Sequence, residues 1–160
     1  MTGRGSAVVL EYTQSIRGAP DEVFPLLCPV REGDWLEGWS DHCRLVHSVS
    51  GVAERGCVFL TMHPGEPDTI WVVTRHDPAE RVVEFCHVQA GVEAVTLEIA
   101  VTGALGGSSV AIRYTAVPLP GADVTRFDER WTQTAFDADL RWWEDSMNHY
   151  LATGTILRHR

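Results

Sequence analysis

The order of the expected elements constrains this chain most. Strand-forming sequence fills most of the first 123 residues, and one long helical segment follows over residues 124–153. Apolar residues recur in that segment at i, i+4 and i+8, so they form a stripe along a helix. A helix of about 29 residues would be ~43 Å long. A helix that follows an antiparallel sheet usually packs across one face of it, so the order predicts an α+β domain.

Seven segments are predicted to be strands, at residues 7–16, 44–50, 57–62, 69–75, 81–88, 92–102 and 109–117. Turn-forming sequence separates the last six, which is typical of an antiparallel meander. After the first strand, Pro20 and the two acidic residues that follow it predict a short helix, which Pro25 must end or kink. A second short helix is predicted over residues 31–35. We expect one domain over residues 1–160, with residues 1–6 frayed.

The composition excludes several classes of function. The net charge is −9, and all 13 basic residues are Arg. Without Lys, no side chain can form a Schiff base, so lysine-dependent aldolase chemistry is excluded. The acidic balance argues against nucleic-acid binding. The sequence has no P-loop, Rossmann fingerprint, G-x-S-x-G or H-E-x-x-H motif, and no cofactor is expected.

Cysteine spacing and hydropathy indicate where such a chain would reside. Cys28, Cys43, Cys57 and Cys86 form no C-x-x-C pair, and no His or carboxylate lies at metal spacing from His42 or His47, so no metal site is expected. No signal segment and no apolar run of ~18 residues are present, so no membrane span is expected. We expect a cytoplasmic protein with reduced thiols. A homodimer is compatible with the sequence, although no exposed apolar stripe marks an interface.

Three segments resemble a known superfamily. APDEVF at residues 19–24 and GVAERGCVF at residues 51–59 are similar to the first helix and first hairpin of the START / Bet v 1-like (SRPBCC) superfamily. VFPLLCPVREGDWLEGW at residues 23–39 looks like a polyketide cyclase/dehydratase-like bacterial branch of unassigned function. The resemblance covers the chain after Ser6. It implies a helix-grip fold: a curved seven-stranded antiparallel sheet wrapped around the long C-terminal helix, with two short helices after the first strand.

The resemblance also implies a cavity between sheet and helix, of a kind that holds ~300–1,000 Å³. Strand alternation predicts which side chains face it. The predicted ligand-binding residues are Trp35, Trp39, Trp71, Phe85, His87, Leu97, Ile99, Ile112, Tyr114, Phe136, Leu140, Trp143 and Met147. Ordinary core packing is the alternative explanation for the aromatic residues. Cys86 should face away from His87, and His63 is expected to be a solvated loop residue.

Three functions remain open at this point. The first is binding of a small hydrophobic or aromatic molecule, such as a lipid or polyketide. The second is a polyketide cyclase/dehydratase-like enzyme in which His87 and Tyr114 are catalytic and transfer protons. The alternative for His87 is a hydrogen-bonded histidine near a strand end. The third function is a protein-interaction module with a vestigial cavity.

Overall fold

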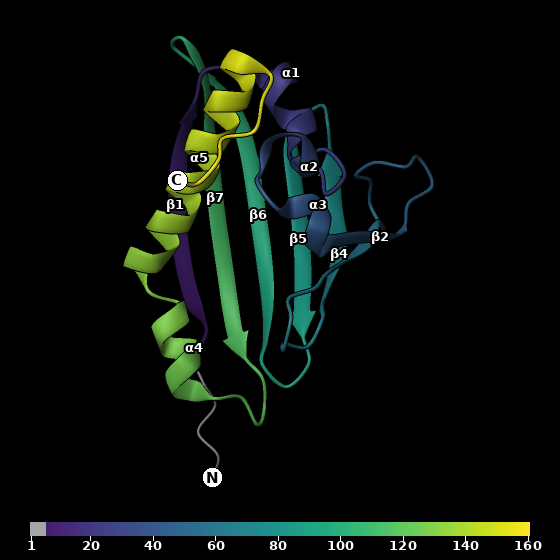
Figure 1. The fold of residues 1–160 in the computed structure, drawn as a ribbon, viewed down its shortest axis with the longest axis vertical. Helices are drawn as coiled ribbons and strands as arrows, with labels where there is room; N and C mark the ends of the chain where they lie inside the picture. The colour runs from purple at the N-terminus through teal and green to yellow at the C-terminus, as the bar shows by residue number, and fades with distance from the viewer. Residues whose placement is uncertain (1–5) are drawn as a thin grey trace.

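The computed structural model describes residues 6–160, which form one curved antiparallel sheet with helices on one side (Figure 1). Its seven strands lie in the order β1-β7-β6-β5-β4-β3-β2. They are β1 (Val8–Ile16), β2 (Cys43–His47), β3 (Val58–Thr61), β4 (Thr69–Asp77), β5 (Val82–Gln89), β6 (Glu93–Ala104) and β7 (Gly107–Pro118). The predicted helix-grip architecture is confirmed. The expectation that the N-terminus frays falls mainly on residues 1–5, which lie outside the described residues.

Three short helices and one 3₁₀ turn connect β1 to β2. They are α1 (Pro20–Val23), η1 (Phe24–Leu26), α2 (Glu32–Trp35) and α3 (Trp39–His42). Pro25 lies inside η1, because it cannot donate the bond that would continue α1. The sequence did not predict α3. Gly38 begins it from a left-handed conformation, with φ at 77°, which glycine adopts without strain.

The C-terminal helical segment differs from the prediction. Instead of one helix over residues 124–153, the structure has α4 (Val124–Arg130) and α5 (Gln133–Thr153) (Figure 1). Trp131 leaves helical geometry, and the Thr132 hydroxyl accepts a hydrogen bond from the Ala135 amide at 3.2 Å. Thr is a favoured N-cap residue, so Thr132 begins a second helix. The apolar stripe continues across the break, which is why periodicity alone predicted one helix.

Helix α5 lies along the free edge of β1 (Figure 1), and some of its polar side chains bond to the backbone of that edge. Gln14 Nε2 donates to the Leu140 carbonyl at 2.9 Å, and the Ser15 amide donates to the Glu144 carboxylate. Asn148 Nδ2 donates to the Ser15 carbonyl at 3.0 Å. An edge strand exposes unpaired backbone groups. These bonds satisfy part of that edge and fix the position of the helix.

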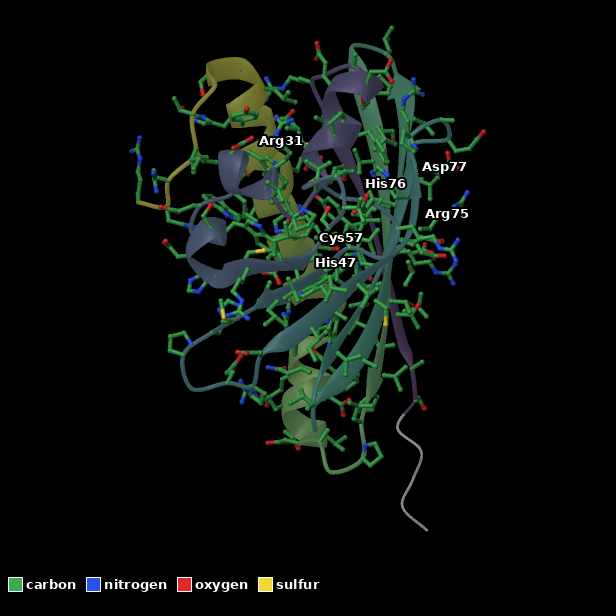
Figure 2. All side chains as sticks on the ribbon, turned by 90° about the vertical axis from the view of Figure 1, so that its right-hand side faces the viewer. Arg31, His47, Cys57, Arg75, His76 and Asp77 are labelled. Atoms are coloured by element: carbon green, nitrogen blue, oxygen red, sulfur yellow. The ribbon has the colours of Figure 1, made fainter. Side chains whose placement is uncertain are left out.

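The two faces of the sheet differ as alternation predicted. On β6 and β7, inward residues such as Leu97 and Ile112 are buried, whereas Glu98 and Arg113 are exposed. Figure 2 shows Arg75 of β4 on the side of the sheet turned away from the helices. The helices and the buried apolar residues therefore share the concave face. No helix within residues 6–160 is both long enough and apolar enough to cross a membrane.

Candidate functional site

A pocket of about 630 Å³ lies between the concave face of the sheet and the C-terminal helices. Strands β3, β4, β5 and β7 contribute Thr61, Trp71, His87 and Tyr114 to its walls, and the C-terminal helices with their junction contribute Arg130, Trp131, Phe136, Leu140 and Trp143. Small-molecule sites typically have ~300–1,000 Å³ and mainly apolar walls. The pocket therefore has the volume of a site for a small organic molecule, and its walls combine aromatic rings with polar and charged side chains.

Indole rings form much of the pocket wall. Trp71 stacks on Phe59 at 5.3 Å between ring centroids, and its ring lies tilted against that of His87 at 4.1 Å. Trp71 Nε1 donates to Thr61 Oγ1 at 2.9 Å, and Trp39 Nε1 donates to the Pro29 carbonyl at 2.7 Å. Because the protein already uses these two N–H groups, Trp39 and Trp71 offer a ligand ring surface rather than donors.

His87 lies in this wall without a hydrogen bond to hold it. Its side chain is buried, and Nδ1 has no partner among the described residues. The alternative of a hydrogen-bonded histidine therefore does not match the structure. Burial, followed by the nearby charge of Arg130, lowers the pKa of His87 to about 4. At neutral pH the ring is uncharged and has one buried nitrogen free.

Tyr114 shares the pocket with His87. Burial raises the pKa of its hydroxyl, and the ring packs edge-on against Phe136 at 5.0 Å between centroids. General acid–base catalysis works best when a group's pKa lies near the working pH. In the free protein, His87 is too weak a base and Tyr114 too weak an acid to meet that condition. The pair is better suited to contacting a ligand than to moving protons.

The structure divides the predicted ligand-binding residues into three sets. The pocket is lined by Trp39, Trp71, His87, Tyr114, Phe136, Leu140 and Trp143. A small void beyond it is lined by Phe85, Leu97 and Ile99, together with Trp39, Trp71 and Trp143. Neither space is lined by Trp35, Ile112 or Met147, which belong to the closed core. Alternation predicts which face a side chain points to, but not how far it lies from empty space.

Glu93 is a pocket residue that sequence reasoning missed. It is buried at the start of β6, and its carboxylate accepts a hydrogen bond from Trp131 Nε1. Glu93 is two residues before Val95 and four before Leu97, which both face inward. Strand alternation therefore predicts that Glu93 faces inward as well. Near Trp131, Arg130 places its guanidinium over the indole at 5.0 Å and pairs with Asp139 at 3.5 Å.

Glu32 is a second carboxyl that the sequence did not single out. It begins α2, it is buried, and it lines the small inner void of about 10 Å³. Burial raises its pKa to about 8. Among residues 6–160, no donor or cation meets its carboxyl. A void of this size holds about one water molecule.

The C-terminal residues fold back beside the pocket mouth, where the chain runs along α5 (Figure 1). The His159 ring stacks on Trp142 at 3.6 Å between centroids, and both residues line the pocket. The His159 amide and Nδ1 bond to Glu37 at 2.9 and 2.8 Å. No periodic pattern in the sequence indicated this contact.

His42 and His63, which are 21 residues apart, come together with their ring centroids 4.9 Å apart. His63 is exposed in a loop, as expected, and it also lines the pocket. Within the described part of the chain, no three His, Cys, Asp or Glu side chains are arranged to hold a metal ion.

Comparison with known proteins gives similarity in fold rather than in sequence. No protein-family model matches the chain, and no curated protein does. Norcoclaurine synthase from Thalictrum flavum aligns with a TM-score of 0.65 and 11% identity, over 94% of this chain and 89% of that one. Ara h 8.0201 aligns with a TM-score of 0.62 and 16% identity, over 92% and 99%.

The protein has the Bet v 1-like helix-grip fold. The predicted resemblance is thereby confirmed at the level of fold. CalU16 from Micromonospora echinospora has the same architecture, with a TM-score of 0.60 and 12% identity over 95% of this chain and 77% of that one. Proteins of one fold carry out different functions, so function has to be argued from the pocket.

Proposed function

We propose that the protein binds a small hydrophobic or aromatic molecule in the pocket between the sheet and the C-terminal helices. The observation that carries the proposal is the pocket itself, about 630 Å³ in volume, with aromatic rings among polar side chains in its walls. Burial of apolar ligand surface against such walls stabilises a complex by roughly 25 cal/mol per Å² before the cost of association is subtracted.

The binding of a neutral naphthalene dye such as N-phenyl-1-naphthylamine, followed by fluorescence, tests the proposal. Ala138 lines the pocket from α5 but is exposed, so Ala138→Trp fills the pocket without disturbing the core. Ala152 is exposed at the far end of the same helix and outside the pocket, so Ala152→Trp is the matched control. We expect at least about tenfold weaker dye binding in Ala138→Trp only. Failure of the wild-type protein to bind the dye, or equal binding by both variants, would contradict the proposal.

A polyketide cyclase/dehydratase-like activity is the second candidate. It is supported by the presence of His87 and Tyr114 in one pocket and by the free nitrogen of His87. The direction of both pKa shifts weakens it, because neither group is poised near neutral pH. Turnover of an aromatic polyketide mimic that is lost in His87→Ala would favour the enzyme. Turnover that His87→Ala leaves unchanged would remove His87 from catalysis.

A protein-interaction module with a vestigial cavity is the third candidate. The volume of the pocket favours ligand binding over this alternative, since a vestigial cavity would be filled by side chains. Native mass spectrometry separates the two, because only a ligand-binding protein should retain a small molecule during purification.

A further inference from the structure

The small void that Glu32 lines lies directly beyond the pocket. Three indole side chains, Trp39, Trp71 and Trp143, line both spaces. The void that the Glu32 carboxyl lines therefore adjoins the pocket in which we place the ligand.

The environment of Glu32 is incomplete without a partner. Its side chain is only 7% exposed, and within residues 6–160 its carboxyl has no hydrogen bond and no ion pair. The other residues that line the void are all apolar or aromatic. A buried carboxyl without a partner destabilises a protein, so such a group in a ligand cavity points to contact with the ligand.

The rings around Glu32 determine which ligand group suits it. Trp39 and Trp71 have their N–H groups bonded elsewhere, so they present ring surface to the void. The void therefore holds a carboxyl and receives no donor from these two indoles. A group that donates hydrogen bonds and carries positive charge, such as an ammonium, is complementary to it, and the ammonium head is about the size of a water molecule.

We propose that Glu32, Trp39, Trp71 and Trp143 form an inner subsite for the protonated nitrogen of an amine whose apolar or aromatic body fills the larger pocket. This inference rests on the proposed binding function and specifies its ligand class.

The remaining charges agree with a cationic ligand. Glu93 is a second buried carboxylate in the pocket, and among the described residues it meets the Trp131 N–H but no cation. The guanidinium of Arg130 is paired with Asp139. The net charge of −9 adds a long-range field that attracts cations.

Amine binding should release a proton. The free protein holds Glu32 protonated at neutral pH, whereas the complex pairs an ammonium with a carboxylate. The other titratable groups near Glu32 are Tyr114 of β7 and Cys43 of β2, and His87 of β5 lies in the adjoining pocket. Burial raises the pKa of Cys43 to about 11, that of Tyr114 is also raised, and that of His87 is about 4. Because His63 and His159 also line the pocket, the comparison with Glu32→Gln assigns the proton release to Glu32.

Calorimetric titration with 2-phenylethylamine, 2-phenylethanol and phenylacetate tests the subsite, because the three probes differ mainly in the charge of one end. The variants are Glu32→Gln and, as a control for net charge, Glu98→Gln on the opposite face of the sheet. In the wild-type and Glu98→Gln proteins we expect the amine to bind at least about tenfold more tightly than the alcohol and to release close to one proton near pH 7. In Glu32→Gln the amine preference and the proton release should disappear while alcohol binding remains.

Equal or tighter binding of the alcohol by the wild-type protein would overturn the inference. Glu32 would then bind a neutral hydrogen-bond acceptor or contact no ligand. Unchanged amine binding by Glu32→Gln would overturn it as well. Binding of the neutral naphthalene dye without binding of the amine would remove the amine subsite and leave the proposed function standing. If neither the dye nor any of the three probes bound, the proposed function would fail together with the inference.

Discussion

Two buried ionisable side chains, Glu32 and His87, connect stability to ligand binding at the scale of single residues. Both are buried and neutral at pH 7, and both lack partners that would favour their charged forms. Their effects on stability oppose each other. Glu32 lowers the free energy of unfolding as the pH rises from 4.5, its ordinary pKa, to about 8, its pKa in the folded protein. His87 lowers the free energy of unfolding as the pH falls from 6.5, its ordinary pKa, to about 4, its pKa in the folded protein.

Glu32→Gln should remove the loss of stability that accompanies the rise from about pH 6.5 to 8. Between about pH 6.5 and 8 the folded wild-type protein retains a proton that the unfolded chain has lost, so unfolding becomes easier by roughly 1–2 kcal/mol. Gln does not titrate, so the free energy of unfolding of the variant should stay level over this range. Urea denaturation at several pH values measures this. A loss of equal size in the variant would show that Glu32 is not buried as described.

His87→Phe should act on the acid side. At about pH 4.5 the unfolded chain protonates the imidazole more readily than the folded protein does, so the substitution should stabilise the protein by roughly 2 kcal/mol more at pH 4.5 than at pH 7. Taking the difference between two pH values cancels any effect of ring size. His47→Phe, at an exposed position on β2, is the control and should show no such difference. A pH-independent effect of His87→Phe would contradict the assigned pKa.

At the scale of elements, the strands were easier to predict from sequence than the helices. Alternation of apolar and polar residues set the inward faces of β5, β6 and β7 correctly, because one face of each strand is buried. The same kind of reasoning joined α4 and α5 into one helix. Apolar spacing is insensitive to a two-residue break, whereas the Thr132 hydroxyl at the start of α5 is a local signal that was given no weight.

Thr132→Ala should destabilise the protein through loss of this N-cap. The hydroxyl accepts from the Ala135 amide, and removing such a cap typically costs about 1 kcal/mol. Thr134→Ala, at an exposed position inside α5, is the matched control and should change stability by less than about 0.5 kcal/mol. Denaturant titration of both variants provides the comparison. Equal effects would show that the helix break does not depend on the cap.

At the scale of the whole molecule, the fold could be predicted from the sequence, but the detailed site could not. Element order and local resemblance were enough for the helix-grip architecture. The contact of His159 with Trp142 and the position of Glu32 in the inner void depend on packing between distant segments. Trp35 illustrates the same limit. It was predicted to bind ligand, but its indole donates to the Leu26 carbonyl within the closed core.

The account depends most on the pocket being a binding site rather than an empty space. Native mass spectrometry of protein purified from its own host tests this directly, with Ala138→Trp and Ala152→Trp as the blocked and control variants. We expect the wild-type and Ala152→Trp proteins to carry a bound molecule of roughly a few hundred daltons, as suits a pocket of this volume. Ala138→Trp should carry none. A bound molecule retained by Ala138→Trp, or none in any of the three proteins, would contradict the account.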